Sequence, residues 1–300
     1  MKLLVICGAT ATGKTKLAVD CAKQLNTEVI SADSQLIYKG LNIGTAKPTA
    51  GEMKGVKHHM IDVVEPQKKF SVFDYEQMAE PIINDLLKRD KVPVICGGTG
   101  FYINSLLFEL SYGNTAENKE IREKYNAILR ENGKEYLFNL LKDVDEETAL
   151  KLHVNDTKRV IRALEIFEAG GKKKSEIKDT LTLKHDYVAV AIGYPRQELY
   201  DRIDTRVDKM IESGLVEEVQ RLLKSGIDET NQCMQAIGYK EVVEYCKNSY
   251  NHSTMRDIIK QNTRHYAKRQ ITFFKKLKDI VWLNPEEATV ERVLELYNEQ

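Results

Sequence analysis

The sequence predicts an α/β fold in which a parallel sheet forms the core and a helical domain is inserted into that core. Short apolar runs, most of them separated by helical stretches, support this fold: KLLVIC, EVISAD, HMIDVV, VPVICGG, YVAVAIGY and IVWL. Buried strands that alternate with helices form parallel sheets with right-handed crossovers. Between residues 114 and 186 no such run occurs, charges alternate in sign and helical periodicity dominates. This is the pattern of an inserted helical domain.

The first apolar run leads directly into GATATGKT, residues 8–15, and a helical stretch follows. The spacing of Gly8, Gly13, Lys14 and Thr15 is that of the Walker A pattern, in the strand–loop–helix context that the pattern requires. Backbone N–H groups of such a loop hold phosphate together with the positive end of the helix. The lysine adds a point charge, and the threonine hydroxyl suits Mg²⁺. The segment predicts a P-loop NTPase-like core with a site for a nucleotide or another organic diphosphate.

The second run ends at Asp33 and Ser34. Carboxyl ends of parallel strands meet at one edge of a sheet, so this pair is expected beside the phosphate loop. Three roles remain open for Asp33. It could be a general base or substrate contact acting on an acceptor nucleophile, a Mg²⁺ ligand through water, or a cap for the following helix. The position favours the first role.

Two further motifs are less specific. The glycine cluster ICGGTGFY, residues 95–102, fits either close approach of the backbone to a ligand or a tight turn before a helix. His58 and His59 would point to opposite faces of a strand, which favours structural roles over a shared metal.

Two later helices carry cations. Arg202 and Arg206 lie one turn apart in residues 200–219, which suits phosphate, although nearby aspartates favour a surface role on spacing alone. Residues 264–278 contain six Lys or Arg and no acid. Arg264, Lys268 and Lys275 fall together on this helix beside an apolar stripe, which suits either a nucleic-acid backbone or plain solvation.

Composition sets the broad class. The chain has 300 residues and a formal net charge of zero, so any affinity for nucleic acid has to come from a local patch. The sequence has no run long enough to cross a bilayer and shows no signal peptide. Its five cysteines lack metal-type spacing. We expect a soluble, reduced, cytoplasmic protein without a membrane partner.

Several stretches together resemble the tRNA dimethylallyltransferases, also called tRNA isopentenyltransferases. They occur in family order and span nearly the whole chain: GATATGKT, SADSQLIYKGLNIGTAKP, HHMIDVVEP, CGGTGFY, NDTKRVIRALE, QAIGYKE and TRHYAKRQITFF. The departures are Ala9 for a usual Pro, Thr157-Lys158 for Pro-Gln, and Phe273 for a common Trp. None removes a hydroxyl, carboxylate or cation that the chemistry needs. The eukaryotic zinc-finger extension is absent, so the sequence resembles the bacterial form.

The resemblance implies an enzyme that transfers the dimethylallyl group from dimethylallyl diphosphate to N6 of adenosine 37 in tRNA. The products are N6-(dimethylallyl)adenosine and diphosphate, and the cofactor is Mg²⁺. Asp33 would be the general base on N6, with Thr10 and Arg206 as the other catalytic residues. This overturns the surface interpretation of Arg206.

The resemblance also assigns binding residues and domains. The diphosphate would be held by Gly8, Ala9, Thr10, Ala11, Thr12, Gly13, Lys14 and Thr15, with Thr15 as the metal ligand. The tRNA would be contacted by Asp33, Ser34, Gln35, Leu36, Thr99, Arg122, Lys158, Arg159, Arg162, Gln235, Gly238, Tyr239, Lys240, Lys268, Arg269, Gln270 and Lys275. Residues 1–113 and 187–300 would form the catalytic core, and residues 114–186 a helical domain that binds the anticodon stem-loop. The chain is expected to be a monomer.

Three other functions share some of these features. A small-molecule kinase would need ATP and no tRNA. Prenylation of free adenine nucleotides would leave the basic helix without a purpose. A non-catalytic RNA-binding protein would have no need for Lys14, Thr15 and Asp33.

Overall fold

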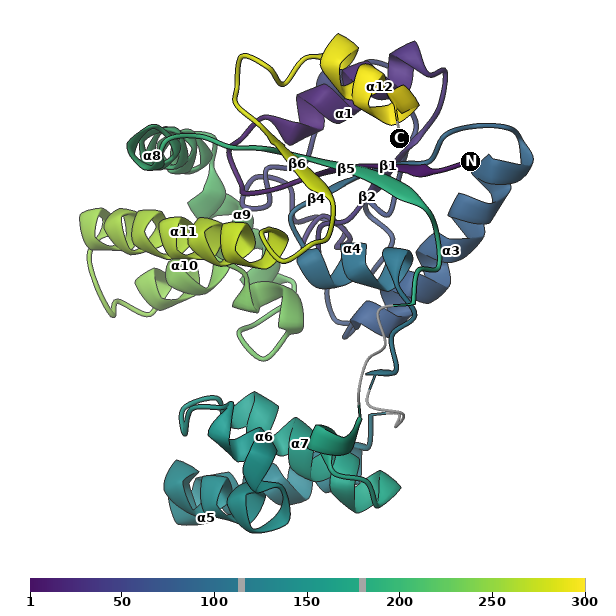
Figure 1. Cartoon of the computed structure of the whole chain (residues 1–300). Helices are drawn as coiled ribbons and strands as arrows, with labels where there is room; N and C mark the ends of the chain where they lie inside the picture. Colours follow the sequence, from purple (N-terminus) through teal and green to yellow (C-terminus); the bar gives the residue numbers. More distant parts are fainter. Residues whose placement is uncertain (113–116, 178–181, 300) are drawn as a thin grey trace. The chain divides into compact units, whose positions relative to one another are not determined.

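The computed structural model describes residues 1–112, 117–177 and 182–299 (Figure 1). The chain folds into two compact units: Met1–Leu107 with Leu183–Gln300, and Phe108–Thr182. The second unit begins and ends a few residues before the expected limits of 114 and 186. The return to the first unit is early because Lys184 already belongs to it. Its backbone N–H donates to the carbonyl of Leu107, 2.8 Å away.

A six-stranded sheet in the order β3-β2-β4-β1-β5-β6 forms the core of the first unit. The strands are β1 (Leu3–Cys7), β2 (Val29–Ser31), β3 (His58–His59), β4 (Val94–Gly97), β5 (Tyr187–Ile192) and β6 (Ile280–Leu283). All neighbouring pairs are parallel. The predicted α/β fold with a parallel sheet is therefore confirmed. Strand β1 is an inner strand of the sheet and is fully buried, as expected of a strand that is covered on both faces.

Helices cover both faces of this sheet. Figure 1 shows α1 (Lys14–Gln24) and α12 (Val290–Glu299) on one side, with α3 (Val72–Lys88) and α4 (Gly100–Leu107) on the other. An apolar cluster of β1, β4, β5, α1 and α12 side chains fills the first interface. On the opposite side Tyr75 of α3 donates its hydroxyl hydrogen to the carbonyl of Ser31, at the end of β2. These contacts fix the strand ends that precede the functional loops.

The run HMIDVV, expected to be a strand, supplies only the second residue of β3. The strand ends there because Met60 and Asp62 adopt positive φ angles of 60° and 54°. His59 Nε2 lies 2.6 Å from the Glu28 carboxylate, and His58 Nδ1 lies 2.8 Å from the carbonyl oxygen of Val56. Both histidines thus have structural partners, in line with the preferred interpretation.

Glu28 is a buried carboxylate at the opposite end of the sheet from the phosphate loop, and its partners Arg89 and Lys57 reach it from the surface. Burial raises its pKa, but hydrogen bonds from Arg89 and His59 outweigh burial and lower the pKa to about 2. The folded state therefore favours the charged carboxylate.

The short helix α2 (Ala50–Met53) contacts α1. The other helices of the first unit form a group that includes two long neighbours, α8 (Arg196–Glu212) and α11 (His252–Phe274) (Figure 1). Its other members are α9 (Leu215–Lys224), the short 3₁₀ helix η3 (Gln232–Gln235) and α10 (Tyr239–Cys246). Helix α11 contains residues 264–274 of the basic helix predicted over residues 264–278, but it begins earlier, at His252, and ends at Phe274, so Lys275 is its C-cap. No helix in the described parts of the chain combines the length and the apolar character that a membrane crossing requires.

The elements in the described part of the second unit are helices joined by turns and coil. It contains α5 (Lys119–Val144), α6 (Glu146–Leu150), α7 (Thr157–Gly170) and the 3₁₀ helix η2 (Lys174–Glu176). Helix α5 kinks at Gly133, whose φ is 83°. Leu137 and Leu141 of α5 pack with Val160 and Leu164 of α7 in an apolar core, so this unit has a core of its own.

Candidate active site

The phosphate loop connects β1 to α1. Gly8 and Gly13 have φ angles of 128° and 88°, a conformation in which any other residue is strained. The Thr12 hydroxyl donates to the carbonyl of Ala9 at 2.9 Å, and Lys14 Nζ donates to the same oxygen at 3.0 Å. These two hydrogen bonds hold the loop around the lysine side chain.

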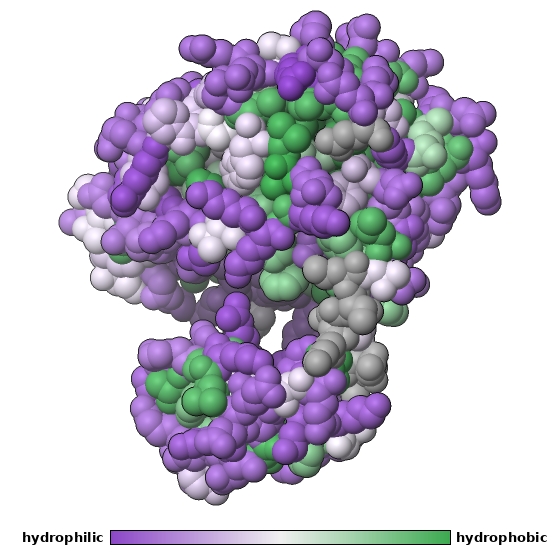
Figure 2. All heavy atoms as spheres, viewed as in Figure 1, coloured by the Kyte–Doolittle hydropathy of each residue, from purple (hydrophilic) through white to green (hydrophobic). Residues whose placement is uncertain are grey.

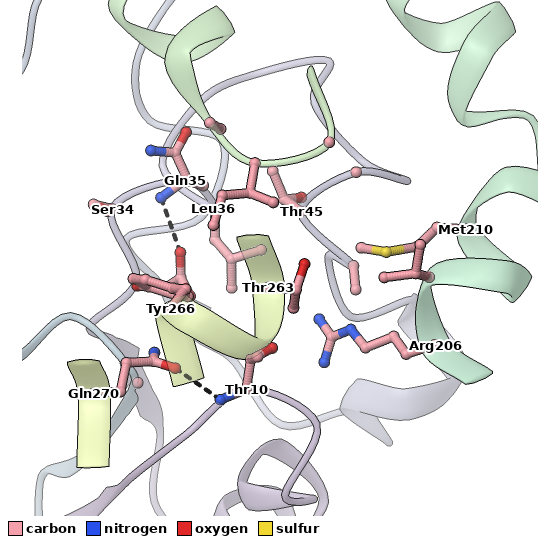
Figure 3. Close-up of a pocket in the computed structure, with 18 of the residues that line it drawn as sticks. Thr10, Ser34, Gln35, Leu36, Thr45, Arg206, Met210, Thr263, Tyr266 and Gln270 are labelled. Atoms are coloured by element: carbon pink, nitrogen blue, oxygen red, sulfur yellow. Dashed lines mark hydrogen bonds between the residues drawn. The ribbon is translucent and has the colours of Figure 1, made fainter. Parts of the chain in front are cut away.

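A cavity of about 380 Å³ opens next to this loop (Figure 3). Its walls come from the phosphate loop, the end of β2, residues 44–46, α8, residues 235–240 and α11. The residues predicted from sequence that line it are Thr10, Lys14, Thr15, Asp33, Ser34, Gln35, Leu36, Arg206, Gln235, Gly238, Lys240, Arg269 and Gln270. The predicted catalytic trio of Asp33, Thr10 and Arg206 thus shares one cavity.

Two cations face this cavity from different elements. Lys14 extends from the start of α1, and Arg206 points into the cavity from α8 (Figure 3). Burial lowers the pKa of Lys14 and also that of Arg206, while the charge of Asp33 acts in the opposite direction on both. Among the described residues, none places a carboxylate within ion-pair distance of Lys14 or Arg206. Both side chains are half-buried, and two partly desolvated cations without a carboxylate partner make this cavity suited to an anion.

Asp33 organises a turn at the end of β2. Its Oδ1 accepts a hydrogen bond from the backbone N–H of Gln35 at 2.9 Å (Figure 3). The residues after it form a turn, and the next helix is α2, which begins at Ala50. The helix-cap interpretation of Asp33 is therefore wrong, because no helix follows it. The carboxylate remains on the cavity wall, where the other two interpretations need it.

The glycines of the second cluster allow other segments of the chain to pack closely against them. A Cβ at Gly97 would lie 2.1 Å from the carbonyl oxygen of Ala32, and one at Gly100 would lie 2.2 Å from the Phe273 ring. The close approaches are thus between β4 and the residue after β2, and between the start of α4 and α11. Thr99 completes the contact: its hydroxyl accepts from the backbone N–H of Ser34 at 2.9 Å.

Gln270 links α11 to the phosphate loop. Its Oε1 accepts from the N–H of Thr10, and its Nε2 donates to the carbonyl of Gly98, both at 2.9 Å (Figure 3). The side chain is buried, with only 5% of the residue exposed. Both ends of this side chain, which we expected to contact tRNA, are engaged within the protein.

Arg202 supports the loop from outside the cavity. Its Nε donates to the carbonyl of Ala11 at 2.9 Å, and its guanidinium lies over the Tyr194 ring, 4.6 Å from the centroid. Arg202 is an exposed residue, as the surface interpretation expects, but its partners in the described part of the chain are the phosphate loop and the Tyr194 ring, not the nearby aspartates.

Sequence reasoning missed Glu218, which holds one wall of the cavity. This α9 residue is 3% exposed and accepts from the backbone N–H groups of Asn42, Ile43 and Gly44. It also accepts from the hydroxyl of Tyr239 at 2.6 Å. A Cβ at Gly44 would lie 2.4 Å from the Tyr239 ring, so loop 42–46 can only pack here with a glycine. No local pattern marks a carboxylate whose partners are some 175 residues away.

The residues predicted to contact tRNA separate into two classes. Lys158, Arg159, Lys268, Arg269 and Lys275 are exposed. Arg122, Arg162 and Tyr239 belong to the second class, which has partners within the protein. The two arginines lie 3.0 Å and 2.7 Å from the buried carboxylate of Glu165, and Tyr239 is fully buried. Arg264, grouped with the basic face from sequence, pairs with Asp204 at 2.7 Å.

Comparison with known proteins was made for the whole chain. The sequence model of the IPP transferase family matches residues 36–277. The chain is 44% identical over 285 residues to a protein of Alkaliphilus oremlandii named tRNA dimethylallyltransferase, covering 94% of this chain and 91% of that one. It is 48% identical over 287 residues to the protein of that name from Thermoanaerobacter sp. (strain X514), with the same coverage of 94% and 91%.

Solved structures give the same result. The full-length tRNA isopentenylpyrophosphate transferase of Bacillus halodurans matches with a TM-score of 0.74 and 38% identity, covering 99% of this chain and 95% of that chain. A eukaryotic dimethylallyltransferase acting on tRNA matches with a TM-score of 0.80 and 31% identity, covering 96% of this chain and 74% of that chain.

Proposed function

Because the chain belongs to the IPP transferase family, we propose that the cavity is the active site of a tRNA dimethylallyltransferase. The enzyme transfers the dimethylallyl group to N6 of adenosine 37 in tRNA and releases diphosphate. The observation that carries this assignment is the pair of half-buried cations, Lys14 and Arg206, which face one cavity together with the carboxylate of Asp33.

The diphosphate end of dimethylallyl diphosphate fits the phosphate loop. When the bond between C1 and the diphosphate oxygen breaks, the leaving group takes the electron pair and gains negative charge. Loop N–H groups, Lys14 and Arg206 are already in place to stabilise that charge, which is the arrangement that lowers such a barrier most. The Thr10 hydroxyl lies on the same wall and is suited to hydrogen bond the leaving oxygen.

The oxygens of this site suit Mg²⁺. Thr15 and Asp33 both line the cavity, and hydroxyl and carboxylate oxygens are ligands that Mg²⁺ accepts. No cluster of three or more His, Cys, Asp or Glu in the described residues could hold a metal by itself, and Mg²⁺ usually takes its other ligands from substrate phosphates and water. Bound there with Thr15 as a protein ligand, it would neutralise part of the diphosphate charge.

Asp33 is suited to the acceptor side. The N6 amine is a poor nucleophile because its lone pair is delocalised into the ring. It becomes competent as it loses a proton while the N6–C1 bond forms. The carboxylate lies on the cavity wall that Ser34, Gln35 and Leu36 continue, so a base placed against these residues would present N6 to it. We assign Asp33 as the group that accepts the proton.

An adenine stacked in a duplex could not reach such a cavity, but an unpaired base of the anticodon loop can be turned out and inserted. Lys268, Arg269 and Lys275 of the first unit are exposed and suited to RNA phosphates. Lys158 and Arg159 are suited to the same role in the helical unit. We propose that the enzyme acts as a monomer in the cytoplasm, where tRNA is available.

The deciding experiment is incubation with labelled dimethylallyl diphosphate or labelled ATP, with and without tRNA. Label should enter RNA only from the prenyl donor. Transfer of the ATP label to a small molecule would instead identify a kinase.

The assignment of Asp33 is tested by Asp33→Asn, which keeps the shape of the side chain and removes its basicity. The single-turnover rate should fall by about 10²–10⁴-fold, with tRNA affinity little changed. Asp279→Asn, an exposed change of the same kind, is the control. A single-turnover rate within a few-fold of the parent enzyme would contradict the base assignment, and a weaker Mg²⁺ dependence would favour the metal-ligand role.

A further inference from the structure

Two aromatic rings meet on the surface between α4 and α11. Phe101, in the first turn of α4, is 62% exposed, whereas hydrophilic side chains cover most of the surface in Figure 2. Its ring contacts that of Phe273 edge to face, with centroids 5.3 Å apart. Phe273 in turn packs at 5.7 Å against Phe274, which is fully buried. The outer ring is therefore exposed, while the ring beneath it is anchored in the core.

The pair lies next to residues of the proposed active site along both helices. Phe101 comes two residues after Thr99, whose hydroxyl holds the N–H of Ser34 on the cavity wall. Phe273 lies one turn beyond Arg269 and Gln270 on α11, and both of those residues line the cavity. A base adjacent to one that occupies the cavity would thus come within reach of the rings.

The surroundings of the pair are positively charged. Lys268, Arg269, Lys275 and Lys276 are exposed on or next to the end of α11, and no carboxylate among the described residues lies within ion-pair distance of these four. An apolar protein partner would have no use for this uncompensated charge. Single-stranded nucleic acid needs both features, an aromatic surface for a base and cations for its backbone.

We infer that Phe101 and Phe273 form a stacking platform for an unpaired base adjacent to the target adenosine. The inference rests on the proposed function and extends it. Turning a base out of a loop breaks its stacking on both neighbours, and this loss opposes the movement. A ring that takes up one of the neighbours recovers part of that energy, so the platform favours the extruded state of the target base.

The test measures binding of an anticodon stem-loop RNA by fluorescence anisotropy. Phe101→Ala should raise Kd by about 5- to 150-fold, the range for the loss of one base–aromatic stack. Phe101→Leu, which keeps apolar bulk without a ring, should recover only part of the loss. Phe73→Ala, which removes a ring that is 51% exposed on α3, is the control and should leave Kd unchanged. Melting temperatures of all three variants establish that they are folded.

A second experiment changes the RNA instead of the protein. Stem-loops with an abasic residue on either side of the target adenosine are compared in parent protein and Phe101→Ala. One of the two abasic RNAs should bind both proteins equally, because the base that stacks is already missing. The salt dependence of binding should stay the same in Phe101→Ala, since no phosphate contact is lost.

The two possible failures are distinguishable. If Phe101→Ala binds the stem-loop like the parent, or if both abasic RNAs keep the full mutant effect, the platform is refuted while prenyl transfer by the parent continues. If the parent transfers no prenyl group to any tRNA, the proposed function itself fails.

Discussion

Replacement of Glu218 tests whether the wall of the cavity is held from outside it. The carboxylate is 3% exposed, and Oε2 accepts from the N–H of Asn42 at 3.0 Å while Oε1 accepts from the N–H of Gly44 at 3.2 Å. The hydroxyl of Tyr239 donates to Oε1 as well. Hydrogen bonds to a charged group contribute about 1.5–3 kcal/mol each. Part of loop 42–46 is exposed, so water will replace some of these bonds, and we expect Glu218→Ala to cost about 2–4 kcal/mol of unfolding free energy.

Glu218→Gln is the more diagnostic variant. Both carboxylate oxygens accept from backbone N–H groups, so the amide NH₂ of glutamine must face an N–H donor in either orientation. Glutamine should therefore fail to restore the wild-type stability. Because Gly44 and Thr45 line the cavity, release of the loop should also lower kcat/KM, by up to about 10²-fold if the wall moves by about 1 Å.

Urea unfolding and steady-state prenyl transfer, measured well below the melting temperature, provide the two readouts. Glu217→Gln is the matched control, because it removes the same charge from the neighbouring exposed position of α9. If Glu218→Gln unfolds and turns over like Glu217→Gln, the carboxylate does not hold the wall and our interpretation of this loop is refuted.

Three further outcomes follow from the structure. Lys14→Ala should lower kcat about 10²–10³-fold, as does loss of another preorganised donor to a developing anion, while urea unfolding stays near that of the parent; equal turnover would refute the role. Replacing Lys268 and Lys275 together by alanine should weaken tRNA binding and reduce the slope of log K against log salt concentration by about 1–2, with the affinity for the prenyl donor unchanged. An unaltered slope would show that these lysines do not contact RNA phosphates. Glu28→Gln should cost about 3 kcal/mol at pH 7. The Glu28 pKa is lowered from 4.5 to about 2. The stability that the charged carboxylate contributes is therefore complete above about pH 5 and is lost as pH falls towards 2. If the loss of unfolding free energy in Glu28→Gln were the same at every pH, this explanation would be contradicted.

Local patterns were sufficient for the strands and the phosphate loop. The sheet, the loop and the position of Asp33 each depend on a few consecutive residues whose burial or backbone conformation is encoded nearby. His58 and His59 show the limit of that method, since the strand they begin stops where Met60 adopts a positive φ of 60°, and β-branched neighbours in the run gave no sign of it.

The supports of the site could not be predicted from such patterns. Gln270 reaches Thr10 across 260 residues, and Glu218 reaches Gly44 across 174 residues. Each is a polar residue on a helix, and sequence alone does not say whether its side chain faces solvent, RNA or another segment of the same chain. The resemblance predicts Gln270 as a tRNA contact and does not indicate its partners Thr10 and Gly98, because a motif records position and not contact.

Charge pairing separates the structural cations of this protein from those of the cavity. Arg122 and Arg162 share the buried carboxylate of Glu165, so the charge buried in the helical unit is balanced within the fold. Lys14 and Arg206 are half-buried and have no ion-pair partner among the described residues. Partial burial lowers the pKa of both side chains, so less water screens their charges than screens those of Lys268 or Lys275, which are exposed. Under the proposed function the anion that balances Lys14 and Arg206 is the diphosphate, and their charges act on it as it leaves.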